Sequence, residues 1–290
     1  MPRHAIGTDG RWIDRRMTPR HGIGHRIPLA RHLLLSLGLV SAVAAAAFAQ
    51  ASAAASASAK TWIGDAARME AHLRTAEIVS LADIGTGVTL PRRGRLKPAE
   101  PFESLAWKAL PPGFRRDHWE SYKSEIAAYE LDKLLGMNMV PPAVERRFDG
   151  ELGAAIMWLE PTTSVKQRGG KVPTGPAFAK PIRMMQMFDN LIGNVDRNAG
   201  NILIDQANNV ILIDHSRAFT TTADLPWKFE RVDAALWNEF QALTSERLTA
   251  ALGQWLDADA IRSIIGRRDR MVARVDKLVS QKGVAATIIR

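Results

Sequence analysis

The 290-residue sequence contains no cysteine, and aromatic residues make up only 7% of it. The absence of cysteine excludes a disulfide framework, a thiolate nucleophile and a cysteine-ligated zinc site. It does not fix the cellular compartment, since exported proteins can also lack cysteine.

Two common hydrolase signatures are missing as well. The sequence has no G-x-S-x-G motif, so a serine hydrolase of that kind has no support. Beyond residue 60 the histidines are His72, His118 and His215, and they form no H-x-x-x-H pattern or His/Glu cluster. A zinc hydrolase is therefore not indicated.

The body of the chain is not strongly charged. The net charge is +9, but residues 1–59 carry +5 of it and the remainder only +4. Apolar residues make up 46% and charged residues 24%, which is typical of a folded domain. We therefore predict one medium-sized or two-lobed catalytic domain with a tail, and no binding to nucleic acid.

An uncharged segment spans residues 33–59. It begins apolar, continues rich in Ala and Ser, and follows a basic region, which is the order of a secretory signal peptide. Ala47–Ala49 forms an A-x-A site that predicts cleavage before Gln50, and Ala57–Ala59 forms a second candidate site.

The alternative for this segment is an uncleaved anchor, because residues 33–59 are long enough to span a bilayer. Both interpretations leave the basic flank inside and place the rest of the chain outside the cytoplasm. We predict a periplasmic or secreted protein that is membrane-anchored only where the leader is uncleaved. Met17 is an alternative start that would give a leader of more usual length.

The rest of the sequence changes from strand patterns to helix patterns near its middle, with no internal repeat. This order predicts an α+β fold class. The expected helices are 65–74, 121–135, 182–192 and three or four within 233–281; the expected strands are 78–81, 88–90, 102–109, 143–148, 154–159, 202–204 and 210–213, with turns at Pro91, Gly94 and Asp149-Gly150 and a loop at 167–175.

Residues 189–219 combine an apolar hairpin with regularly placed polar residues. Asp196 and Asn201 are five positions apart, and Asp214 ends an apolar strand after a tight turn. One carboxylate can deprotonate a hydroxyl acceptor, while an amide oxygen and a second carboxylate can hold Mg²⁺ against phosphates. A strand–turn–strand hairpin would bring Asn201 and Asp214 to the same end. The alternative is that these residues cap turns, where Asn and Asp are common.

The stretch DNLIGNVDRNAGNIL…ILIDHSRAF resembles the loops of atypical kinases, namely the phosphatidylinositol 3/4-kinase-like, HipA-like and Golgi casein-kinase-type secretory kinases. The resemblance implies that Asp196 is the catalytic base and that Asn201 and Asp214 hold Mg²⁺ or Mn²⁺. Two positions differ from the usual pattern. Asn198 stands where many of these families have His, which removes a group that could stabilise charge. Ser216 stands where Gly is common, which predicts a less flexible metal loop.

The upstream sequence extends this resemblance. ADIGTGVTLPRRGRLK followed by LAWK resembles a nucleotide-covering hairpin and the strand that carries the phosphate-contacting lysine. The resemblance implies that Lys108 contacts phosphate and that Gly85 and Gly87 let the backbone approach the nucleotide. The next helix would supply the ion-pair partner of Lys108, with Glu125 preferred over Glu130.

Residues 156–160 would link the lobes and contact adenine through Met157 and Leu159, with an ordinary core strand as the alternative reading. Asp189 is expected to brace Arg197 or the loop around it.

The resemblance covers about residues 75–280 and implies a two-lobed protein-kinase-like fold. We expect a leader at 1–59, a β-rich N-lobe at 60–160 and an α-helical C-lobe at 161–290. The predicted function is an ATP- and metal-dependent phosphotransferase outside the cytoplasm, acting on a protein in preference to a lipid or small molecule. The alternatives are a non-enzymatic, pseudokinase-like nucleotide-binding scaffold and an AMP transferase.

Overall fold

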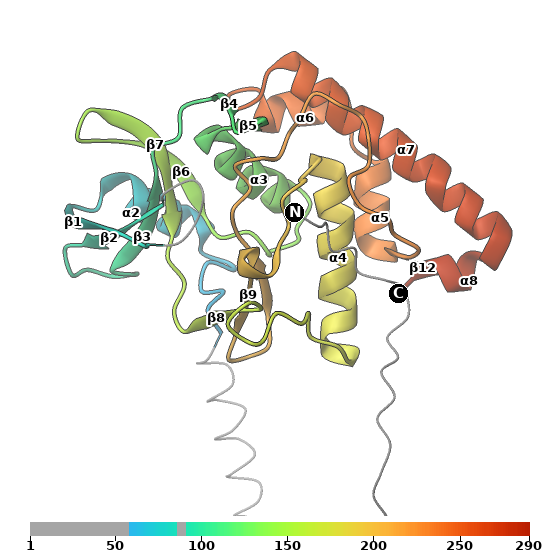
Figure 1. Ribbon diagram of the computed structural model, residues 1–290, viewed down its shortest axis with the longest axis horizontal. Coiled ribbons are helices and arrows are strands. Elements are labelled where there is room, and N and C mark those ends of the chain that lie inside the picture. Colours follow the sequence, from blue (N-terminus) through green and yellow to red (C-terminus); the bar gives the residue numbers. More distant parts are fainter. Residues whose placement is uncertain (1–57, 86–90) are drawn as a thin grey trace, which may run out of the picture. The chain divides into compact units, whose positions relative to one another are not determined.

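The computed structural model describes residues 58–85 and 91–290, which belong to a compact unit that spans 49–290 (Figure 1). The predicted leader therefore lies outside the described residues except for Ser58 and Ala59, and so do the predicted strand 88–90 and Gly87. Within the described part of the chain, no helix is both long and apolar enough to cross a membrane.

The N-terminal part is built on a five-stranded antiparallel sheet in the order β1-β2-β3-β7-β6. Residues of β7 alternate between its two faces, so that Ala155 and Met157 share a core with α2 while Ala154 and Ile156 share one with α3. The elements of this part are α2 (Ala66–Thr75), β1 (Ile78–Asp83), β2 (Arg92–Leu96), β3 (Ser104–Lys108), β4 (Gly113–Arg115), β5 (His118–Glu120), α3 (Tyr122–Leu134), β6 (Ala143–Phe148) and β7 (Glu151–Met157).

Strand β2 runs through Gly94, where the sequence predicted a turn. Gly94 pairs with Leu105 across the β2–β3 ladder, and a Cβ atom at Gly94 would lie 2.8 Å from a methyl carbon of Leu105. The glycine is therefore required by close packing against β3, and the prediction of a turn at this position was wrong.

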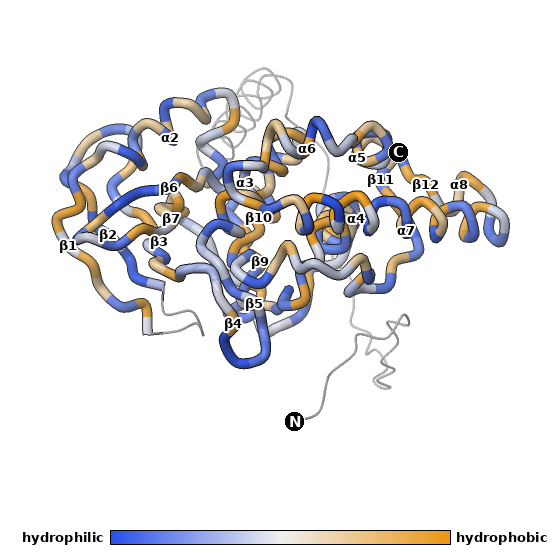
Figure 2. The backbone as a smooth tube through the Cα atoms, turned by 90° about the horizontal axis from the view of Figure 1, so that it is seen from above, coloured by the Kyte–Doolittle hydropathy of each residue, from blue (hydrophilic) through white to orange (hydrophobic). Residues whose placement is uncertain are grey.

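The C-terminal part is mainly helical, as expected. Its small sheet has the order β10-β9-β8, and the amphipathic helix α7 alternates between hydrophilic and hydrophobic residues along its length (Figure 2). The elements are β8 (Thr162–Ser164), α4 (Pro176–Ile192), a 3-10 turn (Ala199–Asn201), β9 (Ile202–Asp205), β10 (Val210–Leu212), β11 (Val232–Asp233), α5 (Ala234–Gln241), α6 (Ser245–Leu252), α7 (Ala258–Lys282), α8 (Val284–Thr287) and β12 (Ile288–Ile289).

Helix α4 ends at Ile192, and Gly193 follows it directly before the polar loop. Gly193 caps the helix with a left-handed backbone (φ 64°), which glycine adopts without strain. The guanidinium of buried Arg267 occupies the space in which a side chain would stand, 2.9 Å from the Cβ position. Arg267 also donates to the Leu191 carbonyl oxygen at 2.8 Å, so α7 fixes the place where the loop begins.

Candidate active site

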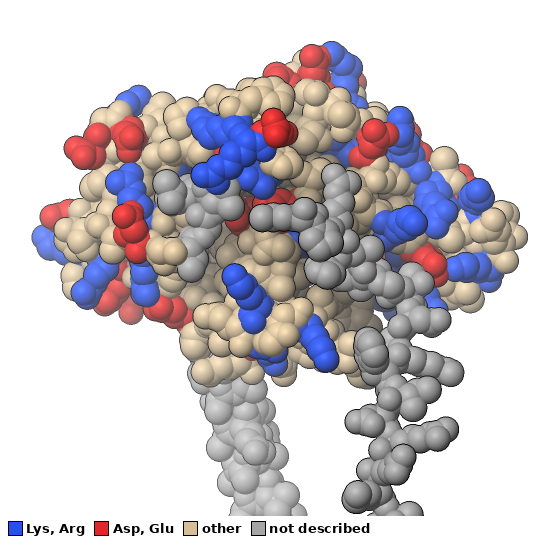
Figure 3. Space-filling view, viewed as in Figure 1, with Lys and Arg blue, Asp and Glu red and all other residues tan. Residues whose placement is uncertain are grey.

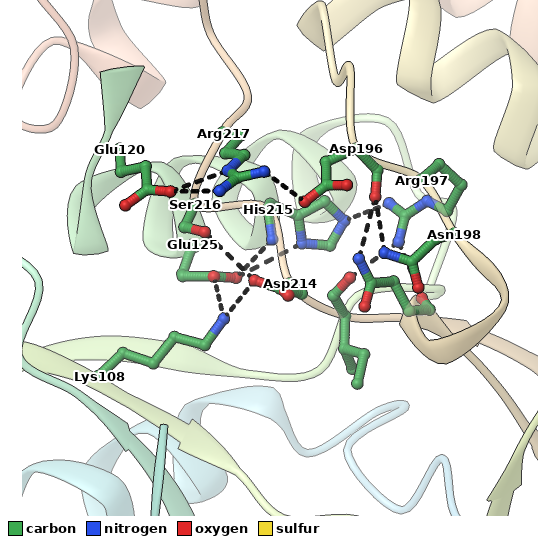
Figure 4. A network of polar contacts seen from close by, with 12 residues as sticks. Lys108, Glu120, Glu125, Asp196, Arg197, Asn198, Asp214, His215, Ser216 and Arg217 are labelled. Carbon is green, nitrogen blue, oxygen red and sulfur yellow. Dashed lines mark hydrogen bonds and ion pairs between the residues drawn. The ribbon is translucent and has the colours of Figure 1, made fainter. Parts of the chain in front are cut away.

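Lys108, the last residue of β3, reaches with its Nζ atom into a buried ion-pair cluster (Figure 4). It is 5% exposed, and its Nζ atom donates to Glu125 Oε1 at 2.6 Å and to Asp214 Oδ1 at 2.7 Å. Burial alone lowers the pKa of a lysine, but the two carboxylates outweigh it and raise the pKa of Lys108 above its ordinary value. The structure thus brings together three site residues predicted from the sequence: Lys108 from β3, Glu125 from α3 and Asp214 from the segment after β10.

Glu125 lies in the first turn of α3, which begins where the Ser121 side chain accepts a hydrogen bond from the Lys123 backbone N–H. Its second oxygen, Oε2, accepts from the His215 backbone N–H at 2.9 Å. Burial opposes ionisation, but Lys108 and His215 hold the pKa of Glu125 well below its usual range. Glu125, and not Glu130, is therefore the helix partner of Lys108.

Asp214 has a left-handed backbone (φ 62°), which is uncommon outside glycine and is often found at functional sites. The Ser216 hydroxyl donates to Asp214 Oδ1 at 3.2 Å, so the residue that replaces the usual glycine holds the carboxylate in place. The Asp214 side chain is 26% exposed and faces solvent more than its neighbours in the cluster do.

Asn201 lies beside Asp214 because β9 and β10 form a hairpin. Beyond the paired residues of this hairpin, the Ile213 backbone N–H donates to the Asn201 carbonyl oxygen at 3.2 Å. The Asn201 Nδ2 atom donates to the backbone carbonyl of Asp196 at 3.0 Å, which leaves the amide oxygen as the atom for a cation.

Asp196 exposes 38% of its side chain at the rim of this group, and its Oδ2 atom accepts from Arg217 Nη1 at 3.2 Å. The same guanidinium forms two bonds to Oε1 of buried Glu120, at 2.8 Å from Nε and 2.7 Å from Nη2. Arg217 therefore links the predicted base to the end of β5.

Arg197, next to the predicted base, points away from it into the protein. It forms a bidentate pair with Asp189, with both bonds at 2.9 Å, which confirms the expectation that Asp189 braces Arg197. Its Nη1 atom also donates at 2.8 Å to the carbonyl oxygens of Asn201 and Ile213, and its Nη2 atom lies 2.9 Å from His215 Nε2. Arg197 thus ties together the two segments that carry the polar side chains.

The predicted adenine-contacting residues line a cavity of about 560 Å³. Met157 and Leu159 lie in its wall, together with Ser104, which shares a face of β3 with Lys108. The lining does not extend to Lys108 or to the polar loop. Gly85 follows β1 with φ 69°, a conformation suited to glycine, but it does not line this cavity.

The sequence did not single out Glu120, Arg217 or His215. Glu120 and Arg217 are 97 positions apart, and no local pattern joins them. His215 is buried, and burial lowers its pKa, so the neutral imidazole is favoured between Glu125 and Arg197. One signal in the sequence could have identified Arg217: it is a charged residue three positions after Asp214, an expected metal ligand.

The comparisons with known proteins agree with this geometry. A sequence model of the phosphatidylinositol 3- and 4-kinase family matches residues 175–254, the range that holds Asp196, Asn201 and Asp214. The structure of hydra Fam20 with sugar superposes with a TM-score of 0.60 at 18% identity, over 76% of this chain and 90% of that one. This chain has an atypical-kinase fold.

Two structures of the Golgi casein kinase support the same conclusion. They superpose with TM-scores of 0.59 and 0.57 at 15% identity, over 77% of this chain and 79% and 78% of theirs, and the second is described with Mn/ADP bound. No curated protein sequence matches the chain. The resemblance to atypical kinases and the α+β, kinase-like fold class expected from the sequence are both confirmed.

Proposed function

We propose that this chain is an ATP- and divalent-metal-dependent phosphotransferase of atypical-kinase fold. The observation that carries the proposal is the pair of bonds from Lys108 to Glu125 and Asp214. A buried ion pair is costly and adds little stability compared with apolar packing, so a cluster of three such groups from separate parts of the chain favours a functional role.

The residues of the site fit a divalent cation. Asp214 and Asn201 offer a carboxylate and an amide oxygen, the hard ligands that Mg²⁺ and Mn²⁺ prefer. Among the described residues, no group of three or more His, Asp or Glu side chains could hold a metal alone. This agrees with a kinase-type ion, which takes its other ligands from phosphates and water.

The local charge balance points the same way. Lys108, Arg197 and Arg217 are the cations of the site. They face an excess of two negative charges in their hydrogen-bonded carboxylate partners, Glu120, Glu125, Asp189, Asp196 and Asp214. One bound divalent cation would neutralise that excess.

In the proposed reaction, Lys108 binds phosphate oxygens of ATP, and Glu125 keeps its ammonium group in place. Asp196 orients the acceptor hydroxyl and accepts its proton. The acceptor oxygen forms a bond to the γ-phosphorus while the bond from phosphorus to the β,γ-bridging oxygen breaks, and ADP leaves. The metal, held by Asn201 and Asp214, would offset the negative charge on the phosphates.

The nucleotide base is proposed to enter the cavity lined by Met157 and Leu159, beside the link between the lobes. We place the lobe boundary near residue 160, as the sequence suggested, with the N-lobe at 60–160 and the C-lobe at 161–290. Gly85 and Gly87 are proposed to cover the phosphates. We further propose export through the leader, with a protein as the acceptor. The Fam20 and Golgi casein kinase similarities support this direction as analogies of fold.

The most direct test is a thermal-shift titration of the chain with Mg-ATP and Mn-ATP. The wild type is expected to gain stability with nucleotide, and Asp214→Ala is expected to lose most of that gain because a metal ligand is removed. Asp224→Ala is the matched control, since Asp224 is an exposed carboxylate paired with Arg270 on α7. No shift in the wild type would overturn the proposal.

ATP labelled at the α- or γ-phosphate, with water and the chain itself as acceptors, separates the remaining possibilities. Transfer of the γ-label supports the phosphotransferase, while transfer of the α-label would show an AMP transferase. A thermal shift without either transfer would favour the scaffold alternative. N-terminal sequencing of the exported protein tests the leader separately, and an intact N-terminus in the cytosol would contradict export.

A further inference from the structure

Three cations lie in the proposed active site, and two of them are engaged away from the base. Lys108 is held between Glu125 and Asp214. Arg197 is 4% exposed at its side chain and binds Asp189 and backbone carbonyls. Among the described residues, Arg217 is the cation that hydrogen-bonds to the carboxylate of Asp196, at 3.2 Å.

The catalytic loop itself supplies an amide near the base where a cation would be useful. Asn198 donates from Nδ2 to the Asp196 carbonyl oxygen at 3.2 Å and accepts at Oδ1 from the Gly200 N–H at 2.8 Å. These bonds shape the 3-10 turn before β9. Asn198 therefore works as a turn-forming residue and brings no positive charge to the loop.

During transfer of a phosphoryl group, negative charge spreads over the three equatorial oxygens, while the attacking and leaving oxygens lie in line on either side of phosphorus. A fixed cation beside the base stabilises that charge and costs little reorganisation during the reaction. We propose that Arg217 is this cation, entering the site from the segment after Asp214 in place of the catalytic-loop residue Asn198. The inference rests on the proposed phosphotransferase function and adds a catalytic residue to it.

The geometry gives Arg217 a reason to be an arginine. Its Nε and Nη2 atoms both bind Glu120 while Nη1 reaches Asp196, so separate nitrogens of one planar guanidinium contact the two carboxylates. Glu120 is 3% exposed, so the Nε and Nη2 side of the Arg217 guanidinium is held by a buried carboxylate. The Ser121 N–H donates to the Ser216 carbonyl oxygen at 3.0 Å, which holds the residues next to Glu120 and Arg217 together.

The surroundings also leave Arg217 open to a substrate. Its side chain is 12% exposed, and Asp196 beside it is well exposed. Basic side chains gather on the face shown in Figure 3, over the β4–β5 hairpin and next to a hollow in which acidic atoms are visible. The guanidinium is thus held by buried Glu120 and also contacts the exposed carboxylate of Asp196, the position at which a substrate would meet the base.

The test compares Arg217→Gln, Arg217→Lys and the double variant Arg217→Gln with Asn198→Lys, using release of the γ-label of Mg-ATP to water and to the chain. Arg217→Gln is expected to lower kcat by about 100-fold or more, with KM for ATP changed by less than about threefold. Arg217→Lys keeps the positive charge and should lose less activity than Arg217→Gln, and Asn198→Lys should restore about tenfold or more in the Arg217→Gln background. Arg270→Gln on α7 is the matched control, since Arg270 pairs with Asp224 at an exposed site.

The outcomes separate three explanations. Arg217→Gln activity within about threefold of wild type would overturn the inference. So would a loss that neither lysine restores and that follows a drop in melting temperature, because Arg217 would then be a structural brace. If the wild type shows neither turnover nor an ATP-dependent thermal shift, the proposed function itself fails and the inference falls with it.

Discussion

Helix α3 buries one carboxylate near each end, and the two environments shift the pKa values of these carboxylates in opposite directions. Glu125 in the first turn is bound by Lys108 and by the His215 N–H, and its pKa is held well below the usual range. Asp132 near the last turn is equally buried, but its Oδ1 atom accepts from the backbone N–H groups of Met139 and Val140. Burial raises the pKa of Asp132 to about 7.

The contrast shows what a cation adds to a buried carboxylate. Backbone amides at Asp132 hold a loop in place but only partly offset the cost of removing charge from water. At Glu125 the ammonium of Lys108 reverses that cost, so the site keeps an ionised carboxylate in the interior. Burial alone therefore does not mark a functional acid; the marker is burial combined with a cationic partner from another element.

The largest expected effect comes from removing that partner. Lys108→Met would leave buried Glu125 and half-buried Asp214 without their cation, and should lower the free energy of unfolding by about 3–5 kcal/mol. Urea unfolding followed by tryptophan fluorescence measures the change. A loss below about 1 kcal/mol would mean that the cluster is solvated in solution.

The second prediction concerns Asp132 and pH. Its folded pKa is about 7 against an ordinary value of 3.8, so the folded state binds the proton more tightly and this stabilising contribution is lost as pH rises from 4 to 7. Asp132→Asn removes the titration and keeps an acceptor oxygen. From pH 4 to pH 8 the variant should gain about 2–4 kcal/mol relative to wild type. A difference that is constant with pH would show that Asp132 is ionised throughout.

A smaller loss is expected for Glu125→Gln. Lys108 keeps its bond to Asp214, and the glutamine oxygen can still accept one hydrogen bond, so the unfolding free energy should fall by about 1–3 kcal/mol. Phosphoryl transfer should fall by a larger factor, since Lys108 is no longer fixed. Equal losses of stability for Glu125→Gln and Lys108→Met would show that losing the charge of Glu125 costs as much as losing the cation of Lys108, and would contradict this prediction.

The smallest effect is expected at Lys133, a second lysine that contacts two carboxylates. Its partners are Glu70 and Glu130, at 2.9 Å each, but its side chain is 42% exposed. Lys133→Met should change the unfolding free energy by about 0–1 kcal/mol because solvent screens exposed pairs. This variant is the matched control for Lys108→Met in the same urea series.

Several elements were predictable because their signals are local. The Ser121 cap and the glycine after Leu135 delimit α3, and the β9–β10 hairpin follows from two short apolar runs around a polar turn. That hairpin alone brings Asn201 and Asp214 together, so the core of the site could be inferred from one stretch of sequence. The distant Lys108 was reached only through the family resemblance.

The features that were missed depend on contacts that local patterns do not show. The β4–β5 hairpin turns through Arg116 and Asp117, both with left-handed backbones, without the glycine that usually signals such a turn. The bond between Glu120 and Arg217 joins segments that only the tertiary fold brings together. The strand through Gly94 was mistaken for a turn for the same reason. Glycine is needed there because the Leu105 side chain on the neighbouring strand leaves no room for a Cβ atom.

Ala59, the last residue of the second predicted cleavage site, belongs to the folded core. Its backbone N–H donates to Asp205 Oδ2 at 2.9 Å, and the residue is 3% exposed in the core that includes α2. Processing before Gln50 would keep this contact, whereas processing after Ala59 would remove a buried residue and leave the Asp205 carboxylate without that donor. Cleavage at the second predicted site would therefore remove a contact that the folded domain makes, whereas cleavage before Gln50 would leave that contact intact.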